Sequence, residues 1–104
     1  MSKKELLQKI KILENDAKKL FQSVDVIIAS NHNYLSERQY IECTNKVNNI
    51  FNQYALMMGV ISNCAHQNVL TEEEADKYRA NCFSNISLLC RKMDKMLNDA
   101  YCTT

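Results

Sequence analysis

The stretch VNNIFNQYALMMGVISNCAHQNVLT, residues 47–71, contains no Lys, Arg, Asp or Glu, although charged residues make up 24% of the whole sequence. Its centre, Tyr54–Ile61, is a run of eight consecutive apolar residues. On a helix such a run is apolar on every side, whereas a helix with one solvent-exposed face carries only an apolar stripe. The stretch therefore predicts a helix that other helices, and on its remaining side a second chain, have to cover.

The composition favours an all-helical protein of one domain. The 104 residues include no Pro and a single Gly, Gly59, so the chain lacks the residues that punctuate sheets and long loops. A chain of this length can bury enough surface to fold alone. Its 13 basic and 12 acidic residues nearly cancel. This balance argues against nucleic acid or an anionic membrane as the partner.

The sequence predicts a cytoplasmic location. The first nine residues interleave charges with leucines, unlike the continuous apolar core of a signal peptide. Polar residues also interrupt the uncharged stretch before it reaches the roughly 20 apolar residues of a membrane span. The five cysteines are an odd count spread over helical patterns, which favours reduced thiols. Ten Lys against three Arg, together with twelve Asn, are common in AT-rich genomes such as those of low-GC bacteria, their phages and some parasites.

Three capping patterns predict three helices. Ser2, Ser36 and Thr71 are each followed three residues later by Glu or Gln, which is the arrangement of a capping box. Polar segments at residues 30–33 and 66–70 supply the turns between them. These signals predict helices over residues 2–30, 36–66 and 71–101.

Within each predicted helix, apolar residues alternate at spacings of three and four, the heptad pattern of coiled coils. Short turns make successive helices antiparallel neighbours. We therefore predict an all-α fold, an elongated antiparallel (up-down-up) three-helix bundle with coiled-coil-like heptad seams. The seam residues are Leu6, Ile10, Leu13, Ala17, Leu20, Val24 and Ile27 in the first helix; Tyr40, Cys43 or Thr44, Val47, Phe51, Tyr54, Met58, Ile61 and Ala65 in the second; and Ala75, Tyr78, Cys82, Ile86, Leu89, Met93, Met96 or Leu97, and Ala100 in the third.

The sequence offers no arrangement typical of catalysis or of metal binding. Cys64 and His66 form the one close Cys-His pair, but residues two apart on a helix point to different sides. Cys82 would be a further ligand type, yet structural zinc sites draw on short spacings such as C-x2-C, which this sequence lacks. We expect a protein that is not an enzyme and that needs no metal or cofactor.

A basic cluster is one candidate for ligand binding. In the predicted bundle the first and third helices run parallel, offset by about 72 residues, which would bring basic residues of both helices together. Such a cluster could bind a phosphate or an acidic peptide. Neighbouring Asp residues dilute the charge, so an ordinary solvated face is the default interpretation of the pattern. The cluster consists of Lys18, Lys19, Arg91, Lys92 and Lys95.

A tyrosine-rich end is a second candidate. Tyr34, Tyr40 and Tyr101, with His32, are expected to gather at the end of the bundle that holds the first turn. Tyrosines offer both a stacking face and a hydroxyl, so they could line a small aromatic pocket. The alternative is that they only close the end of the core.

The third candidate is a second face on the middle helix. Leu56, Met57 and Val60 add apolar area beside the seam, and Asn49, Asn52 and Gln53 flank them without charge. The outer helices keep their charges, although every helix of a symmetric bundle has two neighbours. Interface cores are poor in charge and rich in Met and aromatic residues, so this pattern predicts a partner-binding surface.

These patterns predict a small non-enzymatic binding protein, an adaptor, inhibitor or immunity-type factor. It would act through the charge-free face of the middle helix, as a homo-oligomer, on a protein partner, or both. The alternative is an oligomeric helical sponge for a small anionic or nucleotide signal, in the style of phage defence antagonists. Neither reading involves a membrane or a nucleic acid.

Overall fold

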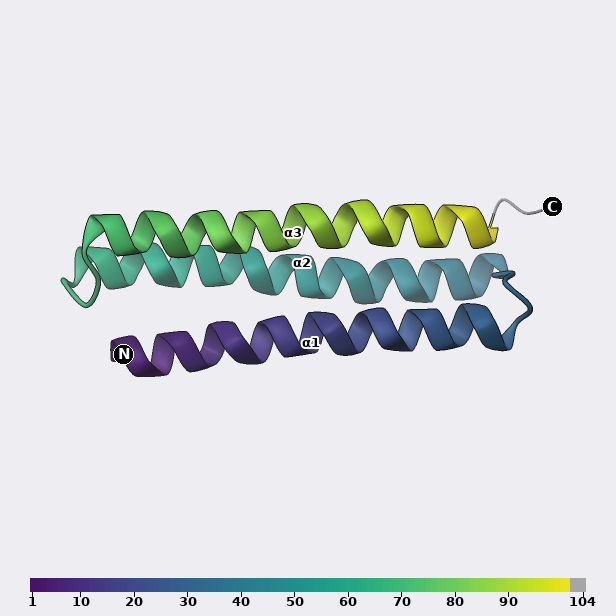
Figure 1. Ribbon diagram of the computed structural model, residues 1–104, viewed down its shortest axis with the longest axis horizontal. Coiled ribbons are helices and arrows are strands. Elements are labelled where there is room, and N and C mark those ends of the chain that lie inside the picture. Colours follow the sequence, from purple (N-terminus) through teal and green to yellow (C-terminus); the bar gives the residue numbers. More distant parts are fainter. Residues whose placement is uncertain (102–104) are drawn as a thin grey trace.

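The computed structural model describes residues 1–101, and this part of the chain is all-helical, with three α-helices and no strand. The helices lie side by side along the long axis of a rod measuring 53 × 18 × 16 Å, and successive helices run in opposite directions (Figure 1). The all-α prediction is confirmed, whereas coiled-coil packing stays a prediction. The helices are α1, Lys3–Ser30; α2, Glu37–His66; and α3, Glu72–Tyr101.

Each helix begins directly after one of the predicted capping residues. At α1, Ser2 Oγ accepts a hydrogen bond from the Glu5 N–H at 3.2 Å. At α2 the bonds are reciprocal: Ser36 Oγ accepts from the Gln39 N–H, and Gln39 Oε1 accepts from the Ser36 N–H. Thr71 and Glu74 repeat this reciprocal pair at α3. The helix starts are therefore fixed by local sequence signals.

Left-handed residues turn the chain between the helices. His32 and Asn33 have φ angles of 55° and 62°, and Asn68 has a φ of 59° in the second turn. Asn and His adopt this conformation more readily than most residues, and it ends a helix. Each turn then places one leucine, Leu35 or Leu70, in the core.

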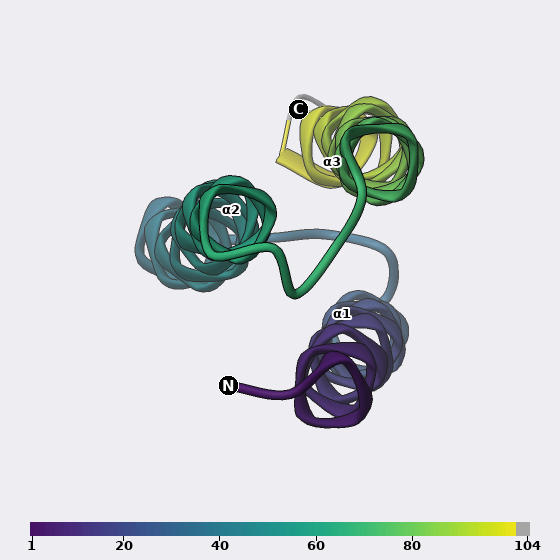
Figure 2. The same ribbon diagram turned by 90° about the vertical axis from the view of Figure 1, so that its left-hand side faces the viewer.

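The core runs the length of the rod between the three helices, which surround it in end view (Figure 2). α3 packs closely along α2, whereas α1 and α3 approach one another less. Lys3 and Glu74 form an ion pair that joins the starts of α1 and α3; it raises the pKa of Lys3 and lowers that of Glu74. The buried residues are Leu6, Leu13, Leu20, Val24, Leu35, Cys43, Val47, Ile50, Tyr54, Ile61, Cys64, Leu70, Ala75, Cys82, Ile86, Leu89, Met93, Leu97 and Ala100.

The predicted seam of α2 was wrong at Phe51, which is exposed, while its neighbour Ile50 is buried. Adjacent helix residues lie about 100° apart, so only one of the two can point into the core. The buried set shares Cys43, Val47, Tyr54 and Ile61 with the predicted seam. In place of Phe51 and Ala65 it uses the preceding residues Ile50 and Cys64, so the seam is rotated by one residue there.

The structure does not require a glycine at position 59. A Cβ atom built there would meet no atom within 4 Å, and the residue is exposed. Of the two explanations that a mid-helix Gly allows, close approach of another helix and tolerance at a surface, the structure of the single chain fits the second.

Candidate functional site

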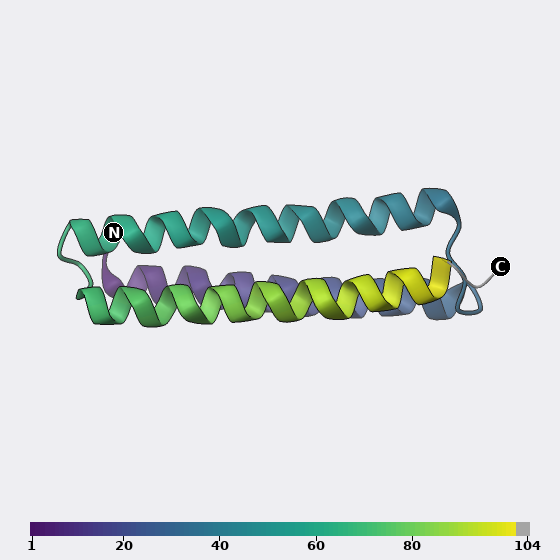
Figure 3. The same ribbon diagram turned by 90° about the horizontal axis from the view of Figure 1, so that it is seen from above.

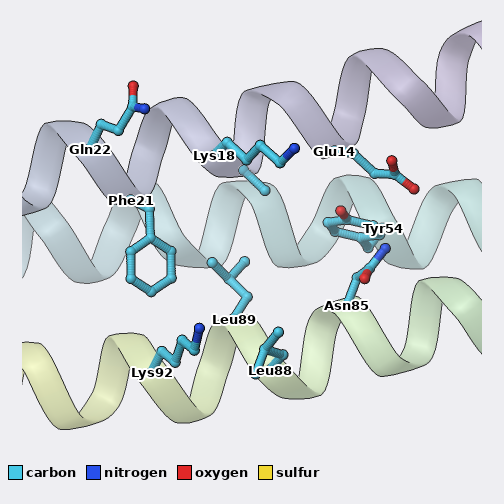
Figure 4. Close-up of a pocket in the computed structure, with 10 residues that line it drawn as sticks. Glu14, Lys18, Phe21, Gln22, Tyr54, Asn85, Leu88, Leu89 and Lys92 are labelled. Atoms are coloured by element: carbon cyan, nitrogen blue, oxygen red, sulfur yellow. The ribbon is translucent and has the colours of Figure 1, made fainter.

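A groove of about 520 Å³ lies between α1 and α3. α1 and α3 are the two helices that contact one another least, and Tyr54 of α2 forms the floor of the groove between them (Figure 4). Its volume lies in the range of small-molecule sites, roughly 300–1,000 Å³. The lining residues are Glu14, Ala17, Lys18, Phe21 and Gln22 of α1, Tyr54 of α2, and Asn85, Leu88, Leu89 and Lys92 of α3.

The middle of the groove is apolar. Phe21 of α1 and Leu89 of α3 extend from opposite walls, and Leu88 continues the α3 wall (Figure 4). Leu88 is 48% exposed. At Ala17 the small side chain leaves the space that a larger seam residue would fill. A ligand in this groove would therefore contact hydrocarbon on both sides.

The two ends of the groove differ in charge. At one end, the Lys92 ammonium lies 6.0 Å from the centre of the Phe21 ring, within the range of a cation–π contact. Glu14, Tyr54 and Asn85 lie at the other end (Figure 4).

The Tyr54 hydroxyl remains protonated. Burial raises the pKa of Tyr54 to about 12, the negative charge of Glu14 adds to the increase, and a hydrogen bond with the Asn85 side chain opposes it. A neutral phenol and a carboxamide can each donate and accept hydrogen bonds. This end of the groove therefore offers neutral hydrogen-bonding groups beside the Glu14 carboxylate.

Two of the five predicted basic residues, Lys18 of α1 and Lys92 of α3, line the groove. The Lys18 side chain extends toward Glu14, whereas Lys92 lies at the Phe21 end (Figure 4). Lys18 forms no ion pair within residues 1–101. The remaining three, Lys19, Arg91 and Lys95, are exposed and do not line it.

The predicted partner face of α2 is partly exposed. Leu56 is 72% exposed, the largest exposed fraction among the large hydrophobic residues described, and Asn49 and Asn52 are exposed beside it. Gln53 is half-buried and donates from Nε2 to Asn49 Oδ1 at 3.4 Å. The other two predicted residues, Met57 and Val60, are half-buried and pack against the core. The face is thus a protruding leucine bordered by uncharged amides.

Beside this face lies a shallow depression of about 190 Å³ between α1 and α2. Gln53 and Met57 line it from α2, and Lys9, Ile12, Leu13 and Asp16 line it from α1. Ile12 is 59% exposed, so an apolar residue of α1 extends the α2 face. Ile12 was not among the predicted partner-binding residues. The signal that could have identified it is an isoleucine that lies outside the predicted α1 seam.

The tyrosine-rich end contains a stacked pair instead of the expected cluster of three tyrosines. The rings of Tyr40 and Tyr101 are 4.6 Å apart, and the Tyr40 hydroxyl donates to Asn98 Oδ1 at 3.2 Å. Tyr34 and His32 are exposed. A cavity at this end is lined by none of these residues, but by Asp25, Ile28, Asn33, Met96, Asp99 and Ala100.

The thiols lie in the core and form no disulfide within the described residues. Cys43, Cys64 and Cys82 are buried and Cys90 is half-buried, while Cys102 lies outside the described residues. Burial raises the pKa of Cys43, Cys82 and Cys90, which disfavours the reactive thiolate.

In residues 1–101 no three His, Cys, Asp or Glu side chains are placed to hold a metal ion.

No protein-family model, curated protein or solved structure matches this chain. Across residues 1–101, none of the three helices combines the length and the apolar character that crossing a membrane requires. The case for a function therefore depends on the geometry of the groove and of the α1–α2 face.

Proposed function

We propose that the protein is a small non-enzymatic binding protein that self-associates through the face containing Leu56 of α2 and Ile12 of α1. The observation that carries this proposal is the 72% exposure of Leu56 within a helix segment that lacks charge. Burying a leucine stabilises a complex by roughly 1.5–3 kcal/mol relative to leaving it in water. Uncharged amides around it can form hydrogen bonds across an interface without the desolvation of an ion.

A second copy of the chain is the occupant that this face fits. A two-fold interface needs one surface that is complementary to itself. This face has both a protruding apolar residue, Leu56, and an apolar depression beside Ile12. Met57 lines the depression and is the sequence neighbour of Leu56, so the protrusion and the depression lie at one height along the rod.

The symmetry axis follows from this arrangement. A two-fold axis parallel to the helices preserves height and brings α2 of each copy over α1 of the other. Leu56 of each copy would then enter the depression beside Ile12 of its partner. Figure 3 shows α1 and α2 both extending along the length of the rod, as such a pairing requires.

Within this proposal, the three helices pack as an antiparallel coiled coil. The buried positions of α2 support it, since Cys43, Val47, Ile50, Tyr54, Ile61 and Cys64 follow heptad spacing apart from one skipped position. That position is Met57, which is half-buried at the proposed interface. The dimer would act in the cytoplasm as an adaptor, inhibitor or immunity-type factor of bacterial or phage origin.

Leu56→Asp should convert the dimer to a monomer, because it places a charge in the centre of the apolar contact. Size-exclusion chromatography with light scattering at micromolar concentration measures this directly. Phe83→Asp is the matched control, since Phe83 is 64% exposed on α3 and should leave the dimer intact. A monomeric wild-type protein, or a dimer that only Phe83→Asp dissociates, would contradict the proposal.

A second function, an oligomeric sponge for a small anionic or nucleotide signal, is favoured by one observation. Lys18 and Lys92 come from different helices and line the same groove. A ligand bound only by the folded state stabilises it by about 2.7 kcal/mol at 100 times its Kd. A panel of nucleotides and other small anions that produces no thermal shift would exclude this function.

A further inference from the structure

We infer that the groove between α1 and α3 is a binding site for a compact organic anion with a flat apolar body, such as an aromatic carboxylate. The inference rests on the second function proposed above, for which it names the site and the ligand class. It is independent of the α1–α2 face, because no residue lines both the groove and the depression beside Ile12.

The walls of the groove select the apolar body. Phe21 of α1 and Leu89 of α3 lie beside one another between the two helices, and Leu88 continues the α3 wall (Figure 4). A planar ring placed in the groove would contact an aromatic ring and branched hydrocarbon. It would also cover Leu88, which otherwise leaves 48% of its surface in water. A fully hydrated inorganic anion would gain none of these contacts.

Lys92 selects the anion, and Lys18 adds to the positive charge of the groove. Lys92 already lies over the Phe21 ring at the end away from Glu14. Lys18 lines the groove from the opposite helix without an ion pair in residues 1–101, and its side chain extends toward the Glu14 end (Figure 4). A carboxylate accepts hydrogen bonds from such ammonium groups more strongly than a neutral acceptor does. The groove contains two lysines against one carboxylate, that of Glu14, so it carries a net positive charge.

The opposite end of the groove sets the orientation of the ligand. Glu14 repels a carboxylate from the end that contains Tyr54 and Asn85. The neutral Tyr54 hydroxyl and the Asn85 amide can instead bind an uncharged polar substituent. The anionic group would therefore lie at the Phe21–Lys92 end, and any neutral hydrogen-bonding group at the Tyr54 end.

The test uses 2-naphthoate as the probe, with two matched ligands. 2-Naphthamide has the same ring system without the charge, and inorganic phosphate has the charge without the ring. Isothermal titration should show binding of naphthoate, with naphthamide weaker by about tenfold and phosphate weaker still. Equal binding of naphthoate and naphthamide would overturn the role of the lysines, and equal binding of phosphate would overturn the role of the apolar walls.

Variants then locate the site. The double variant Lys18→Gln, Lys92→Gln should weaken naphthoate binding at least tenfold, whereas Lys19→Gln, Lys95→Gln should leave it unchanged. The two pairs remove the same net charge from the same two helices, so an equal loss in both would indicate bulk electrostatics and overturn the site. Ala17→Leu fills the groove and keeps both lysines; it should also reduce binding, and unchanged circular dichroism shows that the variant folds.

The failure of this inference can be distinguished from failure of the sponge function. If nucleotides stabilise the protein and naphthoate does not bind, the sponge function stands and the ligand class is wrong. If naphthoate binds and the Lys18→Gln, Lys92→Gln variant binds it equally well, the assigned site is wrong. If neither nucleotides nor naphthoate bind, both proposals fail.

Discussion

Tyr54→Ala should lower the free energy of unfolding by about 3–5 kcal/mol, the range for truncating a large buried aromatic residue. Tyr54 is 1% exposed and lies in the middle of α2, where it packs in the core and forms the floor of the α1–α3 groove. Small domains are stable by only about 5–15 kcal/mol, so this loss is a large share of the total. Urea unfolding followed by circular dichroism measures it.

The matched control is Phe51→Ala, one helical turn away. Phe51 is 42% exposed, so its truncation should have a much smaller effect than that of Tyr54. Ile50→Ala should lower the free energy of unfolding more than Phe51→Ala does, although isoleucine is the smaller residue, because Ile50 is buried. The reverse order would show that α2 is rotated toward the heptad seam that contains Phe51.

Tyr54→Phe distinguishes the contribution of the Tyr54 hydroxyl to stability from that of its ring, and the pH dependence of stability measures the difference. The pKa of Tyr54 is raised from 10.0 to about 12, chiefly by burial, so the folded state favours the protonated phenol. The stability that this pKa difference contributes is fully present below pH 10 and is lost as the pH rises from 10 towards 12. Tyr54→Phe should remove that part of the alkaline loss of stability, and identical alkaline profiles for the two proteins would contradict it.

The ends of the helices could be predicted because their signals are local. The capping residues Ser2, Ser36 and Thr71 form hydrogen bonds with residues three positions away, so no tertiary information is needed to recognise them. Pro and Gly are also nearly absent, which left few alternatives to helix. Short segments of this sequence are therefore enough to predict the helices and the residues at which they begin.

The side of α2 that enters the core could not be predicted in the same way. Two heptad seams fit its sequence equally well, since both contain Val47, Tyr54 and Ile61 and differ in using Ile50 or Phe51. Hydrophobicity and size favour neither. The choice depends on where α1 and α3 contact the helix, and no segment of α2 encodes that position.

Predicting the groove would also have required information from distant parts of the chain. The parallel arrangement of α1 and α3 could be predicted, and it placed Lys18 and Lys92 along the same groove. The spacing between those helices could not be predicted, because it follows from how α2 packs against each of them. For the same reason Ile12 remained unrecognised: its exposure depends on the α1–α2 contact, not on its own helix.

Leu35→Ala should lower the free energy of unfolding by about 2–5 kcal/mol, the range for a buried leucine. Leu35 lies in the turn between α1 and α2 and is 0% exposed, which is unusual for a turn residue. Its backbone N–H donates to the Ala100 carbonyl at 3.1 Å, so the turn is attached to the end of α3. Removing the side chain would leave a cavity where all three helices meet, and urea unfolding would measure the loss.

The adjacent Tyr34→Ala is the matched control, because Tyr34 is 44% exposed and should change stability little. A loss confined to Leu35→Ala would show that this turn takes part in the core. Equal effects would indicate that the turn acts only as a connection. The register of α1 against α2 would then depend on the heptad seams alone, which a one-residue rotation of α2 satisfies equally well.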